Sequence, residues 1–287
     1  MKDDAPSRTA EVVCLARASD QRRPPDDRIL DDPYARSFLG ALSRAALATA
    51  EMSGKLGDEI ERSALGLLPY VLCRHRYIDD CLAAFLADPA PGRVVLLGAG
   101  YDSRAWRFAD ALAGRTLYEV DHPATAGRKE TIVAGMTLPE VDRRVVVTDF
   151  IHTPLEEALA DVGVAPGERT FFVWEGVSMY LTREALKQTF RVMREVAGPG
   201  SKLAMDFWYL TDKPDLRSTA HRMSPGLLSL LGEHITFGIH PEDVGDFLRR
   251  EGLNLLEIAD ARELERRYVR DSRRVYPAAY LLHAEVR

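Results

Sequence analysis

Residues 93–108 read RVVLLGAGYDSRAWRF, and this stretch decides the fold. The apolar run at its start predicts a buried strand, and the two glycines predict a tight turn into a helix. A phosphate-binding loop would continue with a third glycine and small residues. Here Asp102 and Arg104 follow instead. We therefore expect the turn to approach a ligand closely, but not a ligand that presents a pyrophosphate.

Strand and helix signals alternate from about residue 70 onward, which is typical of a parallel sheet with helices on both faces. The helix 183–197, for example, places its apolar side chains on one face and ends at a GPGS turn. Two more strands near the end of the chain complete a seven-stranded, mostly parallel sheet. The predicted strands are 93–98, 115–121, 144–150, 170–176, 201–207, 253–260 and 278–287.

The remaining segments predict additions to one domain that spans residues 1–287. Residues 1–69 are mostly helical and precede the first strand, so we expect them to form an N-terminal cover. Residues 210–235 interrupt the alternation, and we expect them to form an inserted helical lid.

Composition excludes several classes of protein. A net charge of −6 disfavours a nucleic-acid partner, which would require an excess of Lys and Arg. Three cysteines without paired spacing indicate a reducing compartment and no disulfide framework. The first residues lack the apolar segment of a signal peptide, and no apolar run reaches 18 residues. No spacing typical of metal ligands stands out. We therefore expect a soluble cytoplasmic protein without a metal.

Ligands of open parallel sheets bind at the carboxyl ends of the strands. There the sequence places Gly98 and Gly100 after the first strand, and acids after the next three, at Asp121, Asp149 and Glu175. Acids suit a ligand with hydroxyls, amines or positive charge. Asp121 lies about 20 residues beyond the glycine turn, the spacing at which a carboxylate accepts from both ribose hydroxyls. The alternatives are a capping acid and a glycine turn that bind no ligand.

The helix before the first strand, YVLCRHRYIDDCLAAFL at 70–86, carries an arginine on its apolar face. Helical periodicity places Arg74 among inward-facing residues and Arg76 on the opposite side. A buried guanidinium stays charged and requires an anionic partner. Two alternatives follow: an ion pair with an acid of this chain, or a contact with a ligand carboxylate.

Together these positions describe a site for a nucleoside that carries an amino acid and no phosphate. Its hydroxyls would bind Asp121, its carboxylate Arg74, and an amino group Asp149 or Glu175. S-adenosyl-L-methionine is the common compound of this kind, and we expect it to be the cofactor.

The motifs VVLLGAGYDSRAWR, YEVDHP, VVTDF and WEGVSMYLT resemble, in order and spacing, those of the leucine carboxyl methyltransferase family. The resemblance also includes DDRILDDPYARSFLG and RHRYIDD, and it covers roughly residues 8–206. It is strongest to bacterial O-methyltransferases that act on polyketides and other small metabolites. The resemblance implies a class I methyltransferase-like Rossmann fold with S-adenosyl-L-methionine as cofactor.

The same resemblance implies roles for individual residues. Arg74 would bind the methionine carboxylate near the Gly98 backbone, Asp121 the ribose, and Glu175 the amino group. Asp149 would bind the adenine edge, with Phe150 beside the ring. Asp102 and Arg104 belong to the motif, and we expect them to brace the loop as an ion pair.

Acceptor chemistry is less determined by the sequence. Tyr180 lies just past the fourth strand, where it would orient the acceptor or simply pack in the core. Trp208, Tyr209 and the 210–235 insertion would form an apolar chamber for an aromatic or polyketide-like acceptor. A carboxylate acceptor needs no base, whereas a hydroxyl would benefit from one of the histidines, among which the sequence selects none.

Three other functions stay open. A nicotinamide-dependent oxidoreductase has a similar turn but a third glycine, a protein carboxyl methyltransferase would need a docking surface, and a binding protein without turnover would share the site.

Overall fold

A seven-stranded sheet forms the centre of the computed structural model, which describes residues 8–52, 66–148, 154–209 and 236–287. The strand order is β3-β2-β1-β4-β5-β7-β6, and β7 alone runs in the direction opposite to that of the other six strands. The predicted fold class is therefore confirmed. The strands are β1 Arg93–Leu97, β2 Leu117–Asp121, β3 Arg143–Val147, β4 Thr170–Trp174, β5 Lys202–Trp208, β6 Leu253–Ala259 and β7 Ala279–Val286.

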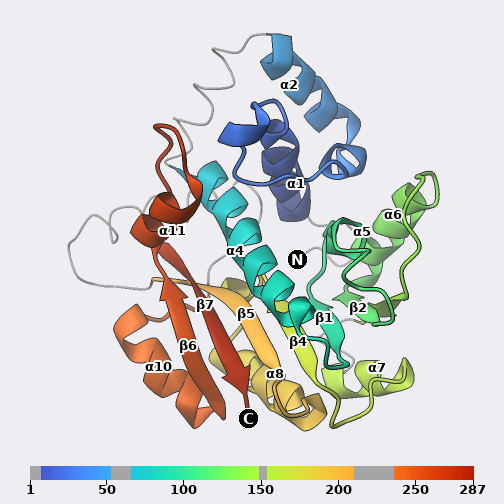
Figure 1. The fold of residues 1–287 in the computed structure, drawn as a ribbon, viewed down its shortest axis with the longest axis vertical. Coiled ribbons are helices and arrows are strands. Elements are labelled where there is room, and N and C mark those ends of the chain that lie inside the picture. Colours follow the sequence, from blue (N-terminus) through green and yellow to red (C-terminus); the bar gives the residue numbers. More distant parts are fainter. Residues whose placement is uncertain (1–7, 53–65, 149–153, 210–235) are drawn as a thin grey trace.

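Helices cover both faces of the sheet (Figure 1). Those over one face are α1 Arg8–Asp20, α2 Ala41–Met52, α4 Leu67–Ala87, α5 Arg104–Arg107, α6 Pro123–Val133 and α11 Ala261–Tyr268, with short 3₁₀ turns at Pro25–Asp27 and Ala35–Phe38. Those over the other face are α7 Leu155–Asp161, α8 Arg183–Val196 and α10 Pro241–Arg250. A further 3₁₀ turn, η3, spans Ser178–Tyr180.

Alternation along the strands creates two cores. In β1, for instance, Val94 and Leu96 pack toward α4, whereas Val95 and Leu97 pack toward α7 and α8. Successive side chains of a strand point to opposite faces, so a strand between two helical layers must be apolar throughout. This explains why β1 and β4 are buried at every residue.

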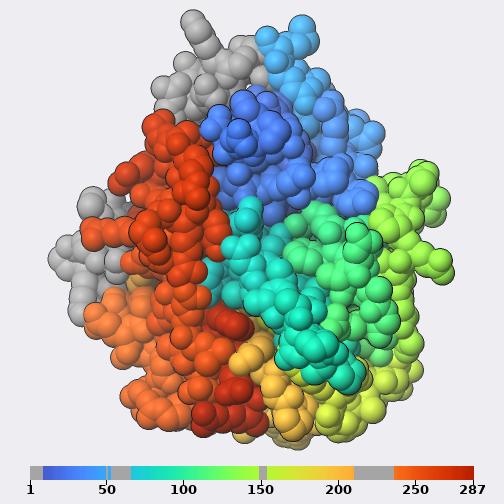
Figure 2. All heavy atoms as spheres, in the orientation of Figure 1, coloured from blue at the N-terminus to red at the C-terminus, as the bar shows by residue number. Residues whose placement is uncertain are grey.

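The order of the strands reverses at β1, which pairs with β2 on one side and with β4 on the other. Helix α4 crosses the sheet near this point, and it lies between α1 and α11 (Figures 1 and 2). Its inward face therefore meets the carboxyl ends of the central strands.

The N-terminal residues that the structure describes are helical, as predicted, whereas the predicted lid at 210–235 lies outside the described residues. The division into one domain with two additions stays a prediction. Among the described helices, none is long and apolar enough to span a membrane.

Candidate functional site

Arg74 projects from α4 toward the ends of β4 and β5, where it is 5% exposed. Its Nε donates to Glu175 Oε1 at 2.9 Å and its Nη1 to Asp206 Oδ2 at 3.3 Å. Of the two alternatives for Arg74, the structure without a ligand thus shows the internal ion pair. The Nη2 group makes no hydrogen bond to any residue that the structure describes. One edge of the guanidinium is therefore available to a further anion.

Arg76 lies on the opposite side of α4, as predicted. It is exposed, and its Nε donates to Asp80 Oδ1 at 3.0 Å.

Glu175 follows β4 and joins three side chains in a buried cluster. Oε1 accepts from Arg74 and lies 2.9 Å from His75 Nδ1, while Oε2 accepts from Arg104 Nη1 at 2.8 Å. Burial opposes ionisation, but His75, Arg104 and Arg74 outweigh it and hold the pKa of the Glu175 carboxyl well below its usual range. Glu175 is therefore an anion at neutral pH and retains room for another donor at Oε2.

The Asp-Ser-Arg sequence after the glycine turn braces the loop through buried ion pairs. Arg104 donates to both oxygens of Asp102, through its backbone N–H and Nη1, which confirms the predicted pair. Its Nε donates to Asp79 Oδ1 at 2.6 Å, and Asp79 also accepts from Arg107. Asp79 and Arg107 were not singled out from the sequence, although Asp79 lies in the RHRYIDD motif.

His75, Asp102 and Glu175 are close enough together to be considered as metal ligands. Arg104, however, contacts all three: Nη1 pairs with Asp102 and Glu175, and Nη2 lies 3.1 Å from His75 Nδ1. A guanidinium already supplies the positive charge that these acids require, so we assign the group to the ion-pair cluster.

His75 gives this cluster a measurable pH dependence. Burial lowers the pKa of His75 to about 4, so the unfolded chain binds a proton here between pH 6.5 and 4 that the folded chain does not. As the pH is lowered from 6.5 to 4, the free energy of unfolding should therefore decrease, and His75 should account for about 3 kcal/mol of that decrease. A His75→Gln variant should lose that part of the decline, measured by urea denaturation at pH 8, 6.5 and 4.5. Parallel curves for the variant and the wild type would contradict it.

Asp121, at the end of β2, holds the glycine turn. Its carboxylate accepts from the backbone N–H groups of Gly100 and His122. Gly98 and Gly100 have φ of 71° and 51°, and a Cβ on Gly98 would lie 2.5 Å from Val177 Cγ2. Burial raises the pKa of the Asp121 carboxyl. Each oxygen binds one amide and keeps a lone pair for another donor.

The structure places Arg74, Glu175, Asp121, Gly98 and Gly100 together at the carboxyl edge of the sheet, as predicted from the sequence. Asp149 and Phe150 lie outside the described residues. Their roles, and the ligand contacts of the five described residues, stay predictions.

Tyr180 lies in η3, just beyond Glu175, where it is partly buried and packs against the core on the α4 face. Trp208 and Tyr209 are buried at the end of β5. Trp208 packs on the same face as α4, with its ring 6.4 Å from the ring of Tyr70. Tyr209 packs on the opposite face. The two residues therefore pack on opposite faces of the sheet, and the predicted acceptor chamber, which would include residues 210–235 outside the described part of the chain, stays a prediction.

Asp206 belongs to the site and was missed by the sequence analysis. It is fully buried in β5, and it accepts from Tyr70, Arg74 and the backbone N–H of Gly176. The signal in the sequence is a single acid in the apolar run KLAMDFW.

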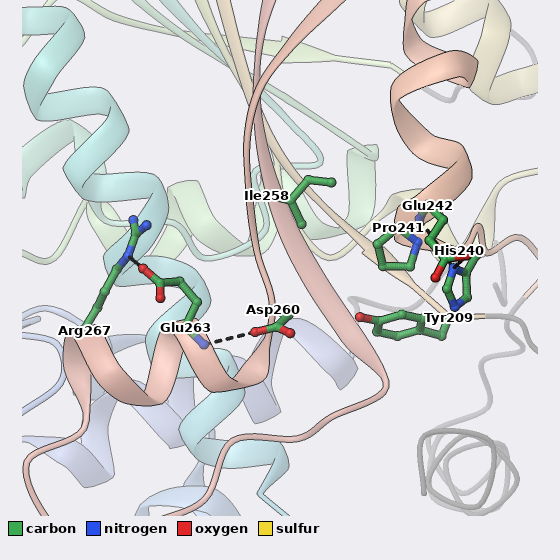
Figure 3. A pocket seen from close by; sticks show the side chains of 8 residues that line it. All are labelled: Tyr209, His240, Pro241, Glu242, Ile258, Asp260, Glu263 and Arg267. Atoms are coloured by element: carbon green, nitrogen blue, oxygen red, sulfur yellow. Dashed lines mark hydrogen bonds and ion pairs between the residues drawn. The ribbon is translucent and has the colours of Figure 1, made fainter. Parts of the chain in front are cut away.

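Two cavities lie elsewhere. One of 420 Å³ lies between β6, α10 and α11, where Glu263 and Arg267 pair with each other (Figure 3). The other, of 320 Å³, lies between α7 and α8 beside the ends of β1 and β4, and its apolar lining includes Leu97, Trp174 and Val177. Neither contains Arg74 or Glu175.

Comparison with known proteins gives a family. The profile of the leucine carboxyl methyltransferase family matches residues 10–194. A protein of Parafrankia sp. (strain EAN1pec) is 36% identical over 69% of this chain and 62% of its own length. A protein of Frankia alni is 30% identical over 76% of this chain and 77% of its own. The names of both assign them to the S-adenosyl-L-methionine-dependent methyltransferases.

The chain spans less than two thirds of the length of the Parafrankia relative that it matches. Among solved structures, a magnesium protoporphyrin IX methyltransferase from Synechocystis PCC 6803 with bound SAH matches 76% of this chain and 85% of its own. The sequence identity is 14% and the TM-score 0.46.

Proposed function

The chain belongs to the leucine carboxyl methyltransferase family, and on that premise we propose that it is an S-adenosyl-L-methionine-dependent O-methyltransferase. The proposed acceptor is a carboxylate or hydroxyl of a small molecule, aromatic or polyketide-like in character. The names of the relatives support the transfer of a methyl group from this cofactor. That the acceptor atom is an oxygen is our own proposal.

The observation that carries the proposal is the arrangement of Arg74, Glu175 and Asp121 at one edge of the sheet. Arg74 and Glu175 pair with each other and are both nearly buried. A zwitterionic amino acid fits such a pair, because its carboxylate would take the Nη2 edge of Arg74 and its ammonium Oε2 of Glu175. The net charge of the cluster then stays the same. Asp121 would accept from the ribose hydroxyls, one glycine turn away.

When bound, the cofactor supplies a methyl group already activated on a sulfonium sulfur. What the chain must do is hold the two reactants in line and keep water from the acceptor oxygen. Arg74, Glu175 and Asp121 would fix the cofactor at three points. A carboxylate acceptor is ionised at neutral pH and needs no general base, so it requires only binding and orientation from this site.

Labelled cofactor tests the proposal. The purified chain, incubated with S-adenosyl-L-methionine carrying a radiolabelled methyl group and a metabolite extract, should give a labelled small molecule. Label released by mild base indicates a methyl ester, and label that resists base indicates an ether. Label found only in protein would favour the protein carboxyl methyltransferase instead. If the cofactor binds but no labelled product forms, the chain would be a binding protein without turnover.

Calorimetry separates the nicotinamide alternative. S-adenosyl-L-methionine should bind, and NADH should not, because the turn lacks the third glycine of the dinucleotide-binding pattern. Tight binding of NADH with no response to S-adenosyl-L-methionine would overturn the proposal.

Gly176 offers a further prediction, because the Nη1 and Nη2 groups of Arg74 lie next to it. A Cβ there would lie 2.9–3.2 Å from three guanidinium atoms, and φ is 68°. Gly176→Ala should lower stability by about 1–2 kcal/mol and weaken cofactor binding at least tenfold by displacing Arg74. Gly114→Ala is the control, since φ is 75° with nothing within 4 Å. It should cost similar stability and leave calorimetric affinity unchanged; equal affinity losses would refute the argument.

A further inference from the structure

The carboxylate of Asp206 forms hydrogen bonds with three parts of the site: the Gly176 turn, Arg74 and Tyr70. Its Oδ1 accepts from the backbone N–H of Gly176 at 2.6 Å. Its Oδ2 accepts from Arg74 Nη1 at 3.3 Å and from the hydroxyl of Tyr70 at 3.2 Å. Asp206 itself is 0% exposed and lies between apolar residues of β5. Bulk water therefore does not reach the Asp206 carboxylate and does not compete for these hydrogen bonds.

These contacts determine where two charges lie. The bond to Nη1 fixes the orientation of the Arg74 guanidinium, and with the bond from Nε to Glu175 it leaves Nη2 as the available edge. The bond to the N–H of Gly176 fixes the turn that directly follows Glu175. Tyr70, one helical turn before Arg74 on α4, places its ring 5.8 Å from the guanidinium carbon and restricts it from another side.

We propose that Asp206 is a positioning residue for the amino-acid end of the cofactor. It acts through Arg74 and the Gly176 turn and does not touch the ligand itself. The inference rests on the proposed function. It adds that the Asp206 carboxylate orients Arg74 so that its Nη2 edge faces the carboxylate of the ligand. Replacing Asp206 should therefore affect only ligands that have a carboxylate.

A positioning role differs from a general structural role in which ligands it affects. S-adenosylhomocysteine and 5′-methylthioadenosine share the nucleoside, but only the first has the amino-acid group. In Asp206→Asn the side chain keeps one acceptor oxygen and turns an NH₂ group toward either the guanidinium or the Gly176 N–H. Calorimetry should show at least a tenfold loss of affinity for S-adenosylhomocysteine and a change of less than twofold for 5′-methylthioadenosine.

Controls make each outcome decisive. Asp80→Asn alters an exposed acid on α4 that pairs with Arg76, and it should change neither affinity. Tyr70→Phe removes one partner of Asp206 and serves if Asp206→Asn does not fold; it should weaken S-adenosylhomocysteine about threefold and spare 5′-methylthioadenosine.

Equal losses for both ligands, or no loss for either, would overturn the positioning role. If the wild-type chain bound neither ligand, the proposed function would fail first, and that failure is visible without any variant.

Discussion

Replacing Arg74 with alanine should weaken the binding of S-adenosylhomocysteine by about 2–5 kcal/mol, or roughly 30- to 4,000-fold. The guanidinium is nearly buried and offers its Nη2 edge, so a ligand carboxylate would lose its counter-charge where water cannot replace it. Isothermal titration calorimetry measures the effect. Binding of 5′-methylthioadenosine, which has no carboxylate, should change little.

The chain provides a matched control two residues along the same helix. Arg76 is exposed and pairs with Asp80, so Arg76→Ala should leave both affinities within about twofold of the wild type. Because Arg74→Ala also removes the cation that pairs with Asp206 and one of the two guanidinium groups that pair with Glu175, we expect it to be destabilised by about 3–5 kcal/mol. Arg74→Lys retains the charge without the planar fork and should still lose affinity at least tenfold. Unchanged affinity in a folded variant would refute the assignment.

Replacing Asp121 with alanine should weaken both S-adenosylhomocysteine and 5′-methylthioadenosine, each by about 2–4 kcal/mol. The carboxylate would accept from the ribose hydroxyls that both ligands share, and hydrogen bonds to a charged group contribute about 1.5–3 kcal/mol each. It also holds the Gly100 and His122 amides, so its loss loosens the glycine turn.

The same titration gives the control. Asp110 is exposed, and Asp110→Ala should leave both affinities unchanged. A loss confined to S-adenosylhomocysteine would place Asp121 at the amino-acid end instead, and no loss would remove it from the site.

The strands were predictable because each is a largely apolar run and most of them end next to a glycine or a charged residue, and the structure reproduces all seven to within a few residues. The inward position of Arg74 was also predictable, since helical periodicity fixes which face a residue occupies. Its partners were not. Glu175 lies 101 positions along the chain and Asp206 132, and no local pattern relates residues that far apart.

Asp206 was overlooked for a different reason. The predicted ligand-binding acids directly follow their strands, whereas β5 continues two residues beyond Asp206, so this acid lies within a strand. The prediction for Asp102 and Arg104 succeeded because the two are only two positions apart and share one turn. The partners of Arg104 on α4, Asp79 and His75, depend on how the helix crosses the sheet, which the sequence does not specify.

A crystal structure with S-adenosylhomocysteine bound tests the central claim most directly. We predict that the ligand carboxylate lies within hydrogen-bond distance of Arg74, its amino group beside Glu175, and its ribose hydroxyls on Asp121. A ligand bound away from this edge of the sheet, or one beside which Arg74 still contacts only Glu175 and Asp206, would contradict it.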